Sequence, residues 1–238
     1  MNHPPGTIGI LSAEESRYSW FHQDMMASMA LLPDDTQIVT VTGQWIAAAV
    51  NGVIARMRPQ DAWVSVYADD HRFDVTMLTA LLDHQLPLVA PLVCLRTAPF
   101  PYAIFHEREG HFIPYTLTEL TGKRGLLPVD TFGGPMAVIR REVIEAVGHP
   151  FFECMPGSRV LPQEDLYTFS KCRRAGFQPM VDLELDIGHC TGMVLYPARH
   201  PDGRYGIRLW AGMTLGTIFY APGEEPVPDP TARGPAYL

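Results

Sequence analysis

The chain has 238 residues, of which 47% are hydrophobic and 18% are charged, and its formal net charge is −8. These values indicate one large soluble globular domain, or one domain plus a tail, and they exclude a chain too polar to bury a core. The negative charge argues against a broad phosphate-binding surface of the kind that nucleic acids need.

The cysteines and the first residues predict the cellular compartment. The four cysteines are scattered with no CxxC pair, so we expect reduced thiols rather than a zinc site. The opening residues MNHPPGTIGIL contain no basic segment followed by a long apolar one, so we expect no signal peptide. The most apolar helical stretch, WIAAAVNGVIA, is too short to cross a bilayer. We therefore expect a cytoplasmic protein with no membrane span.

The first half of the chain alternates predicted strands and helices, which is typical of a parallel α/β sheet. Polar residues follow the first strand, where Ser12 and Glu14 would meet a nucleotide, although Ser-x-Glu also begins many helices. Asn51 interrupts the second helix on what would be a ligand-facing side. Apolar patterning predicts strands at 7–11, 37–42, 63–67 and 88–94, and helices at 18–31, 44–57 and 75–84.

The stretch DAWVSVYADDHRFD, residues 61–74, holds the strongest functional signal. An apolar, β-branched and aromatic run stops abruptly at Asp69-Asp70-His71. Ligands bind at the carboxyl ends of strands in open α/β sheets, and carboxylates with an imidazole suit Mn²⁺ or Mg²⁺ bridging a diphosphate. The same residues could instead form a solvated acidic loop.

The middle of the chain is less regular. Residues 96–128 are rich in Pro, Gly, His and aromatic residues, and we expect an irregular excursion with one short strand at 102–106. Gly133 and Gly134 then precede a strand at 135–139 and a helix at 140–147. Two glycines allow the backbone to approach a ligand closely, although they also form ordinary turns.

Acidic residues begin the next predicted helix. Glu164 and Asp165 open a helix at 166–175, where acids suit the helix dipole without any catalytic role. A strand at 178–185 leads to Gly188-His189. Beyond Pro197 we expect loops, and residues 221–238, with five prolines, should form an extended tail.

Four of these segments form an ordered set of motifs, and the set spans roughly residues 7–192. They are Asp69-Asp70-His71, then Gly133-Gly134 with Arg140-Arg141-Glu142-Val143, then Glu164-Asp165 with Arg174-Ala175-Gly176-Phe177, and finally Gly188-His189. The set resembles the GT-A glycosyltransferases, specifically the short bacterial and bacteriophage enzymes related to the large inverting nucleotide-sugar family. The resemblance implies an α/β fold: a GT-A-like, Rossmann-type nucleotide-binding domain with a mixed, mostly parallel sheet.

The resemblance also implies a role for each matching residue. The relatives often carry Arg-Asn on the second helix, whereas this chain has Val50-Asn51 and so lacks one phosphate-binding cation. The implied roles are metal binding (Mn²⁺ or Mg²⁺) by Asp69, His71 and His189, nucleotide binding by Ser12, Glu14, Asn51 and Asp70, sugar binding by Gly133 and Gly134, and acceptor activation by Asp165 as general base with Glu164 assisting.

The implied function is metal-dependent transfer of a sugar, expected to be a hexose, from a nucleotide sugar to a hydroxyl acceptor, with inversion. UDP is the expected nucleotide. The acceptor could be a protein, a glycan or a hydroxylated base of phage DNA, and a phage-encoded enzyme would act in the bacterial host cell. Two alternatives are a non-catalytic sugar-nucleotide-binding protein and a metal-dependent nucleotidyltransferase. We leave open whether the chain forms a homodimer.

We divide the chain into three regions. Residues 1–198 form the GT-A-like domain, 199–220 form a C-terminal segment, and 221–238 form the Pro-rich tail. The C-terminal segment combines apolar side chains with glycines and with Arg199, Arg204 and Arg208. We therefore expect it to act as a lid over the diphosphate, with static packing against the sheet or a second subunit as the rival interpretation.

Overall fold

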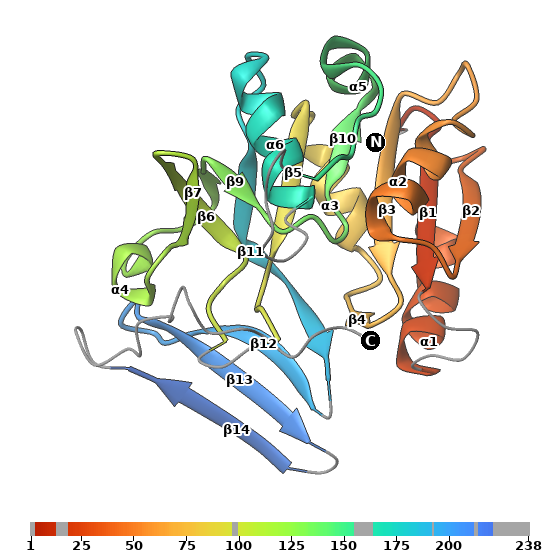
Figure 1. Cartoon of the computed structure of the whole chain (residues 1–238). Helices are drawn as coiled ribbons and strands as arrows, with labels where there is room; N and C mark the ends of the chain where they lie inside the picture. The colour runs from red at the N-terminus through yellow and green to blue at the C-terminus, as the bar shows by residue number, and fades with distance from the viewer. Residues whose placement is uncertain are drawn as a thin grey trace.

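The computed structural model describes residues 3–12, 19–96, 100–154, 164–191, 193–211 and 214–220, and it shows a mixed α/β fold (Figure 1). The first elements are β1 (Thr7–Ser12), α1 (Ser19–Ser28), the 3₁₀ helix η1 (Met29–Leu31), β2 (Gln37–Thr42), α2 (Ile46–Ile54), β3 (Trp63–Ala68), β4 (His71–Arg72), α3 (Met77–Asp83) and β5 (Leu88–Val93). After them come β6 (Ile104–Arg108), β7 (His111–Pro114), α4 (Leu117–Leu120), β8 (Leu126–Pro128), β9 (Thr131–Phe132), β10 (Val138–Arg140) and α5 (Arg141–Val147). The last are α6 (Glu164–Arg174), β11 (Met180–Cys190), β12 (Val194–Arg199), β13 (Tyr205–Ala211) and β14 (Thr214–Phe219).

One large sheet organises the molecule. Its strands follow the order β14-β13-β12-β11-β5-β10-β3-β1-β2, with β4 and β8 also paired to β11. β1 runs parallel to β2 and β3, and β11 runs parallel to β5, whereas β10 is antiparallel to both of its neighbours. The parallel strands therefore all end at the lower edge of the sheet in Figure 1. The predicted mixed α/β sheet is confirmed.

Helices cover both faces of the parallel strands, which explains why β3 and β5 read as continuous apolar runs. Val64 and Val66 of β3 belong to a core cluster that also holds α2 and α5 side chains. Trp63 and Tyr67, which point the other way, belong to a second cluster with side chains from α1 and α3. The four helices are thus held by alternate residues of the same strands.

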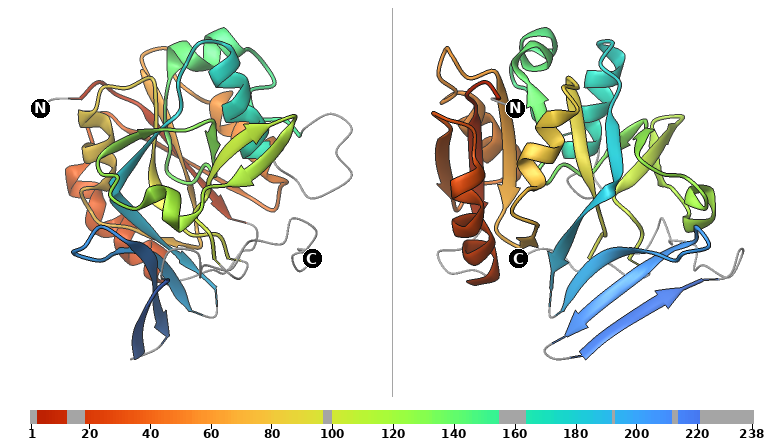
Figure 2. Two further views of the ribbon diagram at one scale, coloured as in Figure 1. Left: turned by 90° about the vertical axis from the view of Figure 1, so that its left-hand side faces the viewer. Right: turned by 180° about the vertical axis from the view of Figure 1, so that it is seen from behind.

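The chain beyond Pro197 differs from the sequence prediction. The prediction of loops there is wrong, because β12, β13 and β14 form an antiparallel extension of the sheet at the edge of β11. These strands lie at the lower end of the molecule in Figure 1 and in both views of Figure 2. Tyr205 and Ile207 are buried, and the Tyr102 hydroxyl donates to the Gly206 carbonyl at 2.5 Å. Tyr205 and Ile207 are thus used in packing, whereas Ile218 is 42% exposed, and the action of the segment as a lid stays a prediction.

Two further differences concern length and position. The excursion at 96–128 holds a β6–β7 hairpin, α4 and β8 rather than one short strand. β11 extends five residues past the predicted end at 185, through an irregularity between Asp182 and Asp186, and therefore includes His189 as a strand residue.

The predicted tail at 221–238 lies outside the described residues. Of the helices that the structure describes, none has the length and apolar character needed to cross a membrane.

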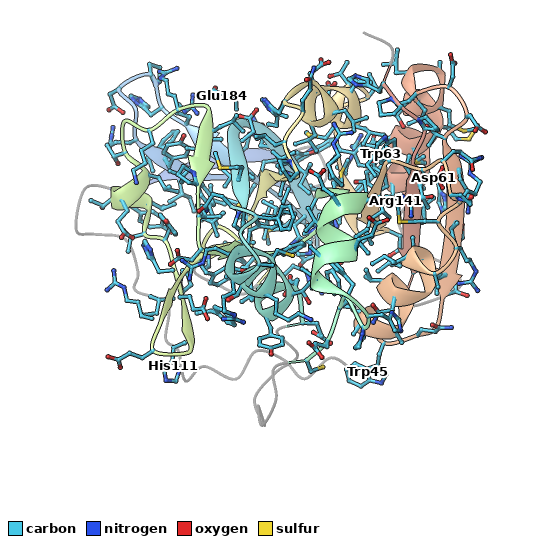
Figure 3. All side chains as sticks on the ribbon, turned by 90° about the horizontal axis from the view of Figure 1, so that it is seen from above. Trp45, Asp61, Trp63, His111, Arg141 and Glu184 are labelled. Atoms are coloured by element: carbon cyan, nitrogen blue, oxygen red, sulfur yellow. The ribbon has the colours of Figure 1, made fainter. Side chains whose placement is uncertain are left out.

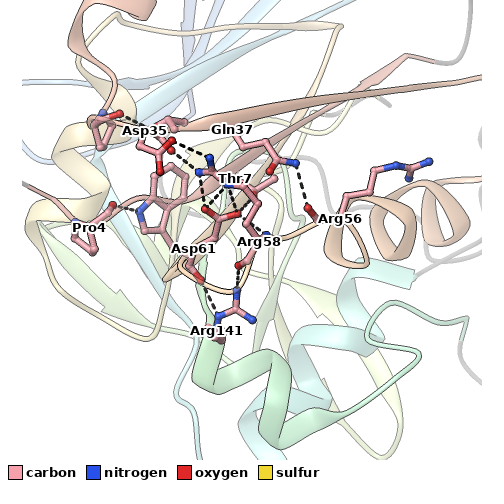
Figure 4. A network of polar contacts seen from close by, with 11 residues as sticks. Pro4, Thr7, Asp35, Gln37, Arg56, Arg58, Asp61 and Arg141 are labelled. Carbon is pink, nitrogen blue, oxygen red and sulfur yellow. Dashed lines mark hydrogen bonds and ion pairs between the residues drawn. The ribbon is translucent and has the colours of Figure 1, made fainter.

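A buried carboxylate ties together the upper end of the sheet, opposite the strand ends just described. Seen from above, Asp61, Trp63 and Arg141 gather there (Figure 3). Asp61 is fully buried and accepts hydrogen bonds from the Thr7 hydroxyl at 2.7 Å and from the Arg58 guanidinium at 2.7 Å (Figure 4). The Arg141 side chain in turn donates to the Asp61 carbonyl at 2.7 Å. Asp61, at the start of the 61–74 stretch, is therefore a structural residue.

Candidate functional site

A short backbone ladder brings the Asp-Asp-His motif to a distant histidine. β3 ends at Ala68, and the chain turns through the two aspartates into β4. β4 pairs antiparallel with β11, so that His71 lies opposite His189. The Cys190 amide also donates to the Asp70 carbonyl at 2.7 Å. Two segments more than 100 residues apart are thus held side by side by backbone hydrogen bonds.

The ladder assembles a three-residue group of Asp70, His71 and His189. One ligand atom from each residue lies within 4.8 Å of the others. His71 Nδ1 is 2.8 Å from one Asp70 oxygen, and His189 Nε2 is 3.5 Å from the other. The two imidazole rings stack with their centroids 4.3 Å apart. The first two residues are about 5% exposed, so the group is shielded from bulk water.

The chemistry of this group fits a divalent metal ion. His189 Nδ1 lies 2.8 Å from the Cys94 carbonyl, which can only accept, so the proton is on Nδ1 and Nε2 keeps its lone pair. His71 Nε2 is buried with no hydrogen-bond partner among the described residues, and the Asp70 oxygen that faces His71 Nδ1 makes an ion-pair contact but no hydrogen bond of good geometry. Buried polar atoms without partners are costly, and a bound cation would satisfy both.

The charges of the group favour metal binding as well. Burial opposes ionisation of Asp70, but the neighbouring imidazoles His71 and His189 hold the pKa of this carboxyl well below its usual range. Burial lowers the pKa of His189, and the adjacent His71 lowers it further. The group therefore presents an ionised carboxylate and a neutral His189 at neutral pH, the forms that bind metals.

The other predicted metal and nucleotide residues lie in different surroundings. Asp69 accepts a hydrogen bond from the Ser12 hydroxyl, so these two side chains meet at the ends of β1 and β3. The structure thus groups Asp70, rather than Asp69, with the histidines. Both amide atoms of Asn51 bond to the Phe152 backbone, at 2.7 and 3.0 Å. Glu14 lies outside the described residues. The ligand roles of these residues stay predictions.

A second part of the site surrounds Asp165 at the start of α6. One carboxylate oxygen accepts from the Leu166 amide at 2.8 Å and the other from the Gly134 amide at 3.2 Å. A Cβ at Gly134 would lie 2.8 Å from the Phe169 ring, so only glycine lets the backbone come this close. Burial raises the pKa of Asp165 to about 6, despite the two amide donors. Glu164 beside it is buried.

A chain of contacts connects the two parts of the site. Cys94, which anchors His189, forms a β-bridge to Tyr102. The next residue, Ala103, accepts a hydrogen bond from the Gly133 amide at 2.7 Å, and Gly134 then contacts Asp165. The predicted glycines, the predicted base and the histidine group therefore belong to one connected region.

Sequence reasoning missed Arg96 in this region. Its guanidinium donates to Asp70 Oδ2 at 2.9 Å. The residue stands at the start of the 96–128 excursion, just after β5, and the available signal was a cation at the carboxyl end of a buried strand. Residues 96–128 show no periodic sequence pattern, so the sequence does not indicate which residue Arg96 contacts.

Comparison with solved structures identifies the fold. A197 from STIV aligns with a TM-score of 0.57 at 14% identity, over 90% of this chain and 97% of A197. The structure of GalNAc-T7 with UDP, GalNAc and Mn²⁺ aligns with a TM-score of 0.52 at 10% identity, over 78% of this chain and 43% of that one. No family model and no curated protein sequence matches the chain.

At these identities the similarity establishes the fold alone. The chain has the GT-A fold that GalNAc-T7 also has, and the expected fold class is confirmed. This chain spans less than half of the GalNAc-T7 chain. The shared fold therefore does not show that this chain has the activity of GalNAc-T7.

Proposed function

We propose that the chain is a metal-dependent glycosyltransferase that moves a sugar from a UDP sugar to a hydroxyl acceptor. The observation that carries the proposal is the group of Asp70, His71 and His189, which the β4–β11 ladder brings together. The shared fold of GalNAc-T7, whose structure holds UDP, GalNAc and Mn²⁺, supports the choice of donor and ion.

Asp70, His71 and His189 would hold the ion. Two imidazoles favour a transition-metal ion such as Mn²⁺ over Mg²⁺, which prefers oxygen ligands. When bound, the ion supplies a Lewis acid that stabilises the negative charge of the departing diphosphate. Ser12 and Asp69, whose side chains meet at the ends of β1 and β3, would bind the nucleotide.

Asp165 is the proposed general base. The Gly134 and Leu166 amides hold its carboxylate in one orientation, and a pKa of about 6 leaves it ionised at neutral pH but basic enough to take a proton. It would accept the proton of the acceptor hydroxyl as the oxygen attacks the anomeric carbon, which inverts the configuration. Gly133 and Gly134 would lie against the donor sugar. The net charge of −8 favours a protein or glycan acceptor over DNA.

Donor hydrolysis tests this proposal without knowledge of the acceptor. The protein is incubated with Mn²⁺ and a panel of nucleotide sugars, and the released nucleotide is identified by chromatography. Slow release of UDP that is lost in His189→Ala but kept in Arg204→Gln, a surface change, is the expected result. Release of a monophosphate or pyrophosphate would instead indicate a nucleotidyltransferase, and binding without release a non-catalytic binding protein.

A further inference from the structure

We propose that Arg96 is the counter-ion of Asp70 in the ion-free chain and passes to the donor diphosphate when a divalent ion binds. The inference rests on the proposed function, because it concerns the same Asp70, His71 and His189 group. It makes Arg96 a residue that couples ion binding to donor binding.

Arg96 contacts the same Asp70 oxygen that faces His189. Its Nη1 lies 2.9 Å from Asp70 Oδ2, the oxygen that also faces His189 Nε2 at 3.5 Å. The Asp70 side chain is 9% exposed, whereas the Arg96 side chain is 31% exposed. The guanidinium thus closes the solvent side of the group.

Asp70 needs such a partner while no ion is bound. A carboxylate this deeply buried is stable only when paired with positive charge. Among the described residues, Arg96 is the one arginine or lysine that forms an ion pair with Asp70.

A divalent ion competes with this pair. An ion held by Asp70, His71 and His189 would place two positive charges beside the carboxylate that Arg96 contacts, and like charges repel strongly where water is excluded. The arginine side chain is long and partly exposed, so it can turn toward the solvent side of the group. A diphosphate bound to the ion would present its oxygens there, and a guanidinium binds phosphate with two parallel hydrogen bonds.

Arg96 also supplies a charge that the second helix does not. Val50 is 1% exposed and packs in the core cluster with Val53 and Ala49, so α2 presents no cation from that position. Cys94, two residues before Arg96, accepts the hydrogen bond that orients His189. The carbonyl that orients His189 and the guanidinium that pairs with Asp70 thus belong to residues only two positions apart in the chain.

The test measures two affinities in the full chain. Mn²⁺ binding without nucleotide is measured by electron paramagnetic resonance of the free ion, and UDP binding at saturating Mn²⁺ by calorimetry. Arg96→Gln is compared with Arg96→Lys, which keeps the charge, and with Arg204→Gln, which breaks a surface pair with Asp202. Thermal unfolding of each variant shows whether it is folded.

We expect opposite shifts in Arg96→Gln: Mn²⁺ binds about tenfold more tightly because a competing charge is gone, and UDP binds about tenfold more weakly. Arg204→Gln should stay close to the wild type, and Arg96→Lys should keep wild-type Mn²⁺ binding but bind UDP less tightly than the wild type, because lysine lacks the two parallel hydrogen bonds. Unchanged or weaker Mn²⁺ binding in a folded Arg96→Gln, or unchanged UDP binding, overturns this inference and leaves the metal site standing. A wild-type protein that binds neither Mn²⁺ nor UDP overturns the proposed function along with it.

Discussion

Replacing Asp165 with Asn should raise the stability of the protein while it lowers the activity. Burial raises the pKa of Asp165 from 3.8 to about 6, so the folded chain binds this proton more tightly than the unfolded chain does. Stability therefore falls as the pH rises from about 4 to above 6, where the carboxyl must ionise in place. A shift of this size corresponds to roughly 3 kcal/mol, and the neutral amide avoids that cost.

The Asp165→Asn variant loses part of this gain in stability because it also loses a hydrogen bond. The two oxygens of Asp165 accept from the Leu166 and Gly134 amides, and Asn can present an oxygen to only one of them. Loss of one such hydrogen bond costs about 1 kcal/mol. We therefore expect Asp165→Asn to be about 1–2 kcal/mol more stable than the wild type at pH 8, while kcat falls by about 10²-fold or more because the base is gone.

Urea unfolding at pH 5 and pH 8 measures the effect. The stability difference between Asp165→Asn and the wild type should grow with pH, and kcat/KM of the wild type should rise through pH 6. Asp202→Asn is the control, since the pKa of this exposed carboxyl is lowered to about 2 by the Arg204 backbone amide and side chain. If Asp165→Asn is less stable than the wild type at pH 8, or if the stability difference between the two is the same at pH 5 and pH 8, then ionisation of buried Asp165 does not destabilise the fold.

Three further changes test other parts of the structure. His71→Ala and His189→Ala should each weaken Mn²⁺-dependent UDP binding by about tenfold or more in calorimetry, because each removes one of three ligands. Asp61→Ala should lower the free energy of unfolding by about 3 kcal/mol or more, since it leaves Arg58 without its buried partner; because the pKa of Asp61 is lowered, this contribution should begin to decline as the pH falls below about 4. Gly134→Ala should cost about 1–3 kcal/mol because its Cβ would lie 2.8 Å from an aromatic ring, whereas Gly216→Ala, which meets nothing within 4 Å, should cost much less.

The parallel part of the fold was predictable because its signals are local. β3 and β5 are continuous apolar runs, and the intervening α3 repeats its leucines with helical spacing. The C-terminal strands β12–β14 were missed because glycines break up the apolar pattern of their sequence, and because Tyr205 and Ile207 are buried only by contacts with distant segments. Long-range pairing leaves little trace in a short window of sequence.

The site was predictable in composition but not in detail. His189 was correctly expected near His71, although the register that places them opposite each other is a property of β4 and β11 together. Sequence patterns do not tell which of two adjacent aspartates faces the histidines, and the structure places Asp70 with them while Asp69 meets Ser12. The direction of a side chain after a strand is set by the turn that follows it.

A crystal of the protein soaked with UDP and MnCl₂ tests the central claim most directly, because anomalous scattering locates manganese without reference to any assumed site. The account predicts one Mn²⁺ bound by Asp70, His71 and His189, at ligand distances of roughly 2.0–2.3 Å, with the UDP diphosphate completing its coordination. Manganese and UDP at another place, or a His189 side chain that does not contact the ion, would contradict it.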